Sequence, residues 1–425
     1  MYKKKMKQSS STNELMMRTT WFQKLSMAIL AVLPLLAWYK IPFPVSLGYA
    51  LVLFLGIYSI AKARFKINVV PPVFWIVFVY ICFMWMYNHN FETWTLMPPG
   101  GWAFFMFFLA LIWGIKSFNI VLLKKYMRYV VLISGILFWI QVICVIITGS
   151  PKFCFVPNLT GEFTYQDFTY ADIVNKQLDG GNPSSIFLEK SYLAYYFLTY
   201  LSLIWFEAKE KSLTLTKEII FVIATLIASR SGSALVGFTI LFAIKLFVLF
   251  WTANIQRRMI LIFLTVPMIV GVIYLYVNSE LGQQMLLRSG ELSDEHTSGF
   301  ARVVGGYMMF DQLNPIEIII GIPDARERFG IERIDGSIIF YVNGIQMILL
   351  SLGYIGLFLY LFFYIRLFRS VGADSKMSII VLLIMGLLES NYLNPYMMLL
   401  TIVPCADYYI NKQTKIHDNE NSILF

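Results

Sequence analysis

Long apolar runs recur along the whole chain and constrain its fold more than any other feature. A helix that crosses a bilayer needs about 20 apolar residues, and about twelve runs fit this scale. They lie at 25–39, 43–61, 69–87, 102–115, 126–148, 190–206, 218–229, 232–251, 259–277, 337–365, 377–388 and 393–410. Three of them (102–115, 218–229 and 377–388) are short, and 337–365 is long. The sequence predicts an all-α fold, a polytopic integral membrane bundle of about twelve transmembrane helices.

Charged residues are too scarce for a soluble protein. They make up 14% of the 425 residues, whereas a soluble domain carries about 25%. This disfavours a soluble enzyme, a nucleic-acid-binding protein and a disordered linker. The net charge of +9 fits basic cytoplasmic loops better than a nucleic-acid partner. The cysteines have neither disulfide-framework nor zinc-site spacing, at Cys82, Cys144, Cys154 and Cys405.

Charge also predicts the orientation of the bundle. Residues 1–24 form a basic tail, and no small-x-small cleavage site follows the first apolar run, so we expect an uncleaved first helix. Alternating from a cytoplasmic N-terminus places most of the 34 Lys and Arg residues inside and most of the 25 Asp and Glu residues outside. Insertion keeps positive residues inside. We therefore expect both termini in the cytoplasm, the C-terminal one being the tail 411–425.

Two large loops, 149–189 and 278–336, divide the helices into three groups and lie on the non-cytoplasmic side. Helices 1–5 occupy 25–148, helices 6–9 occupy 190–277, and helices 10–12 occupy 337–410. Long loops in compact proteins are usually functional or disordered. We therefore expect the functional face to be the outer one.

Two arginines on this outer face are candidate ligands for an anion. Arg230 stands beside Ser231 and Gly232 between two apolar runs. Arginine in hydrocarbon costs about 2.5–3.5 kcal/mol and often marks a pathway or an anionic ligand; the alternative is a side chain that snorkels to the interface. Arg302 lies in the second loop, where a planar guanidinium could bind phosphate or be a solvated charge. Arg326 and Arg328 alternate with acidic residues, which is typical of solvated surface charge.

Other polar residues border the outer ends of the runs. Glu189 and Lys190 begin the run after the first loop, where a carboxylate could complement the helix dipole or take a proton from a sugar hydroxyl. His296 is the one histidine in either large loop and is either solvated or acts on substrate. Asn343 lies close to hydrocarbon, where it could bond another helix or line a cavity.

Several familiar signals are missing. The chain has no phosphate-binding loop and no HExxH motif, so nucleotide-driven transport and metalloprotease chemistry lose support. No cytoplasmic segment is long enough for a nucleotide-sugar-binding domain. Any sugar donor would therefore have to come from the membrane.

Four segments, taken in order, carry a family resemblance. The chain resembles the bacterial O-antigen and capsular polysaccharide polymerases (Wzy), relatives of the O-antigen ligases. The elements are Ser185–Ala194, Ala228–Gly232, Gly299–Pro323 and Asp335–Gly356. Three features depart from the pattern. Lys190 replaces the usual proline, the arginine often seen just upstream of that element is absent, and so is the His-Asn pair common in ligases after the arginine element.

The resemblance implies a specific reaction at the outer leaflet of the bacterial inner (cytoplasmic) membrane. Such enzymes transfer a glycan from a polyprenyl diphosphate carrier to an incoming carrier-linked repeat unit of O-antigen, capsule or lipopolysaccharide, and need no metal and no cofactor. Arg230, Arg302 and Glu189 are then expected to be catalytic. Lys190, Ser231, His296, Asp335 and Asn343 are expected to bind substrate. The implied partners are this oligosaccharide substrate, the lipid bilayer, and a chain-length regulator and a flippase of the same pathway.

Three other activities stay open. A lipid-linked oligosaccharide flippase also has about twelve spans, but it should have short loops on both faces and charges along a path inside the bundle. An O-antigen ligase, or another membrane glycosyl- or acyltransferase, shares the demand for an outer site. The two large outer loops favour the polymerase.

The sidedness generates the first testable prediction. In whole cells lacking exposed thiols, an impermeant thiol reagent should label Cys introduced at Asn175 and at Ser293. The same reagent should not label Cys introduced at Thr214, because that position lies in the cytoplasm. Labelling at Thr214 alone would invert the orientation.

Overall fold

The chain folds into a bundle of long helices. The computed structural model describes residues 19–42, 46–62, 70–88, 99–164, 168–179, 181–206, 213–256, 258–259, 263, 274, 304–322, 325–332, 338–339, 342–388 and 394–423. The long helices of this part are α2 (Trp21–Leu36), α3 (Leu47–Lys62), α4 (Pro72–Asn88), α5 (Pro99–Lys116), α6 (Ile120–Thr148), α8 (Lys190–Trp205), α9 (Leu213–Ala228), α10 (Gly232–Thr252), α17 (Gly344–Ser370), α18 (Ala373–Leu388) and α19 (Pro395–Ile423).

These helices confirm the predicted class, an all-α membrane protein. Each coincides with one apolar run, while the run at 259–277 lies almost wholly outside the described residues. Three helices, α6, α10 and α17, are long and apolar enough to cross a membrane. The number of twelve spans stays a prediction.

The boundaries of three runs differ from the sequence prediction. The runs at 218–229 and 377–388 looked short, yet α9 and α18 each have 16 residues. Each helix begins with polar residues, which hydropathy leaves out but which are helical. The run at 337–365 was expected to be helical from its start, which is wrong: Ile338–Ile339 form strand β2, and α17 begins only after its N-cap, Asn343.

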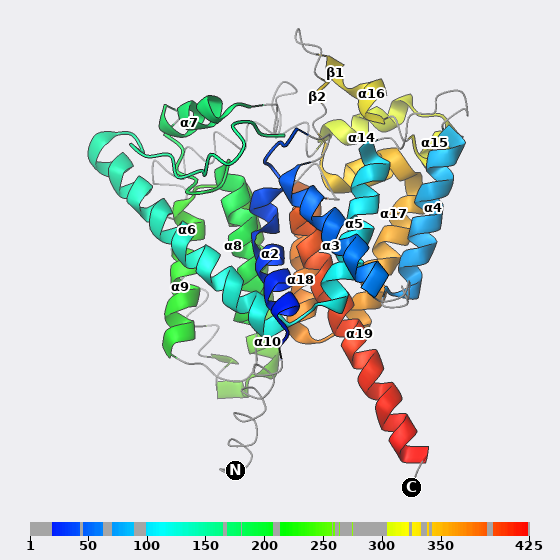
Figure 1. Cartoon of the computed structure of the whole chain (residues 1–425). Helices are drawn as coiled ribbons and strands as arrows, with labels where there is room; N and C mark the ends of the chain where they lie inside the picture. The colour runs from blue at the N-terminus through cyan, green and yellow to red at the C-terminus, as the bar shows by residue number, and fades with distance from the viewer. Residues whose placement is uncertain are drawn as a thin grey trace.

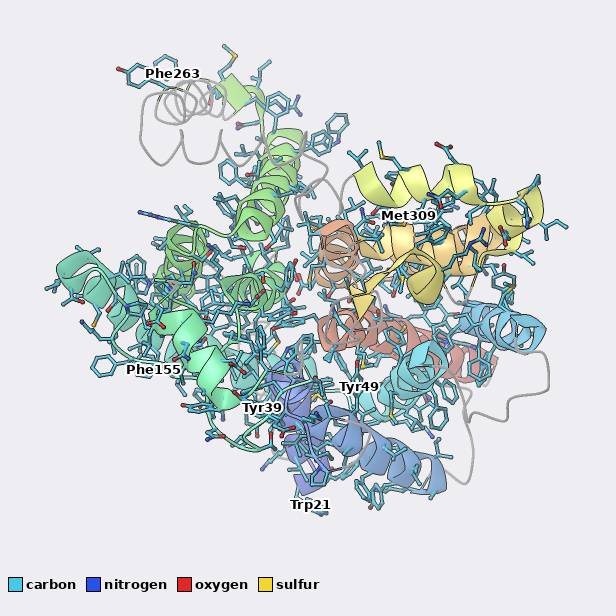
Figure 2. The ribbon with its side chains drawn as sticks, turned by 90° about the horizontal axis from the view of Figure 1, so that it is seen from above. Trp21, Tyr39, Tyr49, Phe155, Phe263 and Met309 are labelled. Atoms are coloured by element: carbon cyan, nitrogen blue, oxygen red, sulfur yellow. The ribbon has the colours of Figure 1, made fainter. Side chains whose placement is uncertain are left out.

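The described parts of the two large loops lie at one end of the bundle. The first carries α7 (Tyr170–Leu178); the second carries α14 (Gly306–Met308), the 3-10 turn η2 (Met309–Gln312), α15 (Pro315–Ile320), α16 (Ala325–Phe329) and β1 (Ile331–Glu332), which pairs antiparallel with β2. Helix α2 begins and α19 ends at the opposite end (Figure 1). Seen from above, the segments around Phe155 and Met309 cover different parts of the loop end (Figure 2). The predicted topology requires this arrangement, with both ends of the bundle's chain on one side and both large loops on the other.

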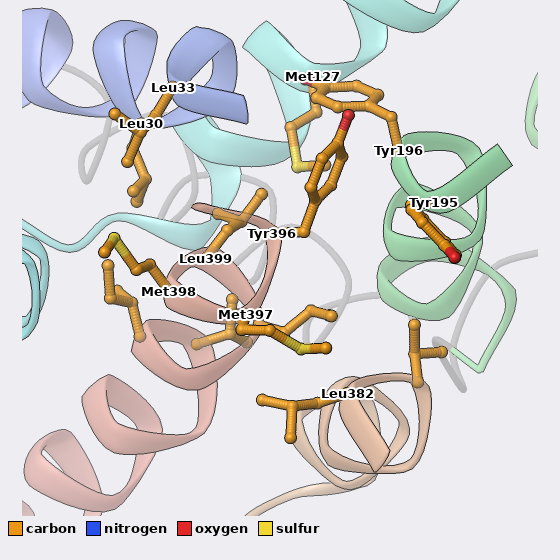
Figure 3. Close-up of a cluster of buried hydrophobic side chains, with 14 of the residues drawn as sticks. Leu30, Leu33, Met127, Tyr195, Tyr196, Leu382, Tyr396, Met397, Met398 and Leu399 are labelled. Atoms are coloured by element: carbon orange, nitrogen blue, oxygen red, sulfur yellow. The ribbon is translucent and has the colours of Figure 1, made fainter. Parts of the chain in front are cut away.

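Helix α8 is the central element of the bundle. Its sequence is apolar and aromatic on every side, which is typical of a helix buried all round, and Tyr192 to Ile204 are all buried. Side chains from α2, α6, α18 and α19 meet it in one cluster (Figure 3). The Tyr196 hydroxyl donates to the Ala31 carbonyl at 2.7 Å, and the Tyr396 hydroxyl donates to the Tyr192 carbonyl at 3.1 Å.

Charged side chains fasten the other end of α8. Glu218 of α9 is buried and pairs with Arg128 of α6, whose Nε lies 3.1 Å from Oε2. The Tyr200 hydroxyl of α8 donates to the other carboxylate oxygen. Lys245 of α10 donates to the Trp205 carbonyl at 2.6 Å, where α8 ends. Because a buried carboxylate without partners is costly, these contacts fix the four helices together.

Helix α17 is broken at Gly353, where the second loop packs against it. Gly353 has φ 63° and ψ −169°, a conformation that is essentially open to glycine alone. Gly321, after α15, lies backbone to backbone with it, and the Ile322 amide donates to the Leu350 carbonyl at 2.7 Å. The Tyr80 hydroxyl of α4 lies 2.8 Å from the Leu352 carbonyl oxygen. Loop, break and α4 thus form one junction.

This junction generates a stability prediction. Gly353→Ala should lower the apparent melting temperature of the purified protein in detergent, because a Cβ would overlap the Ile319 carbonyl oxygen in addition to a backbone strain of about 1–3 kcal/mol. Gly149→Ala is the matched control: Gly149 has φ 78° with no atom within 4 Å of its Cβ position. It should show the backbone cost alone, about 1–2 kcal/mol. Equal losses in both variants would contradict the packing argument.

Candidate functional site

A buried network of hydrogen bonds holds the segment that leads into α8. The side-chain oxygen of Gln141, from α6, accepts the amides of Ser184 at 3.1 Å and Ser185 at 2.8 Å. Gln177, from α7, donates to Ser184 Oγ at 2.6 Å and to the Phe187 carbonyl at 3.0 Å. The two glutamines are joined by a bond of 3.2 Å. Both are fully buried, so the position of residues 184–187 is set by side chains of α6 and α7.

Ser185 adopts an unusual conformation inside this network. Its φ is 57°, in the left-handed region that is rarely occupied by residues other than glycine. Its side chain is fully buried, and within the described part of the chain its Oγ has no hydrogen-bond partner. Strained backbone of this kind persists only where the surroundings over-determine it, and it clusters at functional sites.

Helix α7 supplies the second support of the segment. Its N-cap Thr169 and Asp172 form a capping box. The hydrogen bonds from Thr169 lower the pKa of Asp172. The stability that this cap contributes is therefore fully present above the ordinary pKa of a carboxyl group, and it is lost as the pH falls through the lowered pKa. The helix carries both Gln177 and Lys176 towards α8.

Glu189 lies where this segment becomes α8. It is the N-cap residue, with extended backbone and no side-chain capping bond. One carboxylate oxygen pairs with Lys176, and the other accepts from Ser191 Oγ at 3.2 Å. The side chain is 26% exposed, so a substrate hydroxyl can reach it. Lys190 follows, and its Nζ lies 3.4 Å from Asn182 Oδ1.

Arg230 occupies the turn between α9 and α10. Its φ is 49°, and its side chain is exposed. The structure records no ion pair for it within the described residues. Ser231 caps α10 without a side-chain capping bond, because its Oγ lies 2.8 Å from Ser233 Oγ instead. Above Gly232 there is open space. A free helix start next to an exposed guanidinium favours an anion.

Glu189 and Arg230 lie at the same end of neighbouring helices. Helices α8 and α10 pack together, and a Cβ on Gly237 would lie 2.5 Å from Leu198 Cδ1. Gly237 is about 5 residues from its helix start and Leu198 about 8, so at 1.5 Å per residue the two starts differ in level by about one turn. The structure therefore places Glu189 and Arg230 at similar levels of two neighbouring helices, at the end that carries the loops.

The remaining predicted residues have other positions. Asn343 is buried and caps α17: its Oδ1 accepts the Gln346 amide at 2.8 Å. Arg302, His296 and Asp335 lie outside the described residues. Arg328 is exposed and pairs with Glu317 at 2.7 Å, in agreement with the prediction of a solvated charge.

Sequence reasoning missed the two glutamines. Gln141 is a single amide side chain in α6, and its partners lie 12 to 44 residues away. A polar residue within the apolar run 126–148 was the one available signal, since such a residue in a membrane helix usually has a partner.

Comparison with known proteins adds no assignment to this geometry. No family model matches the chain, and no curated protein matches it. The function is therefore argued from the site and from the resemblance of the four sequence elements.

The network generates a prediction about local order. Gln141→Leu would leave the amides of Ser184 and Ser185 without their acceptor, at a cost of about 1–3 kcal/mol. Amide hydrogen exchange in residues 184–189 should accelerate about tenfold or more, because a 1.4 kcal/mol change in opening free energy is tenfold. Gln413→Leu, an exposed position on α19, should leave this segment unchanged. Unchanged exchange in Gln141→Leu would mean that the network does not hold the segment.

Proposed function

We propose that this protein polymerises polyprenyl-diphosphate-linked oligosaccharide repeat units into O-antigen or capsular polysaccharide. It acts in the bacterial cytoplasmic membrane, with its site on the outer face. The observation that supports this most is that a partly exposed carboxylate, Glu189, and an exposed guanidinium, Arg230, lie at the loop ends of adjacent helices.

The two groups suit the two halves of a glycosyl transfer. Glu189 takes the proton from the acceptor sugar hydroxyl, whose oxygen forms the new bond to the anomeric carbon of the donor. The bond from that carbon to the diphosphate breaks, and the polyprenyl diphosphate leaves with the electron pair. Arg230 and the free start of α10 stabilise the charge that develops on this leaving group. The sugar diphosphate itself supplies the driving force, so the proposal requires neither nucleotide nor metal.

The other predicted residues complete the proposed site. Arg302, in the second loop, is a second ligand for the diphosphate. Lys190, Ser231, His296 and Asp335 contact the sugars or the phosphates. Asn343 contributes by fixing the start of α17, since its side chain is used as the cap of that helix.

The alternative activities lead to different products. A flippase would carry the lipid-linked unit across the membrane, and a ligase would move finished polymer to another acceptor. The buried carboxylate of Glu218 is neutralised by Arg128 at the end of the bundle opposite to Glu189, so it supplies no free charge for a transport path.

Deletion of the gene separates these activities. The polymerase proposal predicts surface glycan of one repeat unit, because carrier loading and flipping continue. Loss of a flippase would instead remove the surface glycan of this pathway, and loss of a ligase would leave long polymer on the carrier. A gel ladder of unchanged length in the deletion strain would refute the proposal.

Complementation of the deletion tests the residues. Arg230→Ala and Arg302→Ala should each lower polymer formation about 10²–10³-fold, the usual cost of one charge-stabilising donor. Arg230→Lys should rescue poorly if the contact is bidentate. Arg328→Ala is the control and should keep a full-length ladder, because Arg328 pairs with Glu317 at the surface. Full-length ladders from both alanine variants, at normal membrane abundance, would refute this mechanism.

A further inference from the structure

A groove opens sideways between α4 and α17, at the end of the bundle away from the loops. Its main cavity has a volume of about 270 Å³ and is lined by Pro72, Ile76, Phe362, Phe363, Arg366 and Tyr408, among others. Ile76 and Phe362 are 54% and 38% exposed, so the wall of the cavity faces the surroundings of the bundle, which are lipid. We propose that this groove binds an anionic glycerophospholipid of the leaflet on that side.

The apolar lining of the groove continues along α17 beyond the main cavity. A second hollow, of about 30 Å³, shares Phe363 with the first and is lined further along by Tyr360, Gly356, Leu352 and Tyr80. From Leu367 back to Leu352, α17 rises about 22 Å, or most of the ~30 Å thickness of the hydrocarbon core. The lining is apolar and aromatic apart from the polar tips of Tyr80, Tyr360 and Tyr364. A hydrocarbon chain is the ligand that such a surface buries without loss of hydrogen bonds.

The mouth of the groove carries the charge that selects the head group. Arg366 is exposed at the end of the cavity, and within the described part of the chain the structure records no ion pair for its side chain. Tyr408 of α19 lines the same cavity. A guanidinium can bind phosphate through two parallel N–H donors while its stem lies along apolar surface.

The position along the bundle agrees with an interfacial phosphate. Arg366 lies in the last turns of α17, at the end where α19 finishes (Figure 1). Basic residues concentrate at this end in the sequence, and basic pockets between membrane helices on the cytoplasmic side bind anionic lipid head groups. The groove lies at the opposite end of the bundle from Glu189, so this proposal does not depend on the proposed polymerisation chemistry.

The experiment is a lipid titration of the purified full chain, followed by native mass spectrometry. The probes are phosphatidylglycerol and phosphatidylcholine with identical acyl chains. Wild type should bind the first phosphatidylglycerol about fivefold more tightly than phosphatidylcholine, the effect of about 1 kcal/mol for one interfacial arginine. Arg366→Ala should lose this preference. Arg369→Ala, one turn further along α17 and also exposed, should keep it.

Two further results test the groove itself. Ile76→Trp fills the cavity without changing its charge, so it should weaken the binding of both lipids about equally. Each variant is compared with wild type for its elution in size-exclusion chromatography. The proposal is wrong if Arg366→Ala binds phosphatidylglycerol as wild type does, if Arg369→Ala loses as much preference, or if Ile76→Trp binds both lipids unchanged. It is also wrong if polyprenyl phosphate displaces phosphatidylglycerol from wild type at equal concentration, since the occupant would then be the carrier.

Discussion

The complete burial of α8 is the constraint on which the rest of the structure depends. Every residue from Tyr192 to Ile204 is buried, so the other helices surround this one. Its start then has one position, at the centre of the loop end. Glu189 lies at that start, and its location is therefore a consequence of packing rather than of a mobile loop.

Polar contacts fix this arrangement more than apolar burial does. Between helices in lipid, apolar association gains little, because lipid tails are as apolar as leucine. Close packing and a few hydrogen bonds are the interactions that hold such helices together. Tyr196 of α8 donates a hydrogen bond to α2, and Lys245 of α10 donates one to the last turn of α8. Glu218 of α9 pairs with Arg128 of α6. Each of these contacts would leave a buried polar group if broken, which costs about 1–3 kcal/mol, so the register of α8 is well determined.

The sequence predicted the helices well because a membrane span has a strong signal of its own. Eleven of the expected runs coincide with helices, and α17 was wrong at its start because Ile338 and Ile339 are apolar but pair as a strand. The supports of the site were not predictable. Gln141 and Ser185 meet across 44 positions, and the contact of Gly321 with Gly353 depends on a helix break that hydropathy cannot show. Local composition defines the elements, whereas these contacts arise only when the bundle closes.

One measurement tests the central claim, that the outer site joins carrier-linked units without help from a nucleotide or a metal. The purified protein is reconstituted into vesicles with a polyprenyl-diphosphate-linked repeat unit, in the presence of a chelator, and the products are sized by mass spectrometry. The account predicts chains of two or more units and released polyprenyl diphosphate from wild type, and about 10²–10³-fold less from Arg230→Ala. Carrier-linked single units that remain unchanged in length with wild-type protein, whether or not they cross the vesicle membrane, would contradict it.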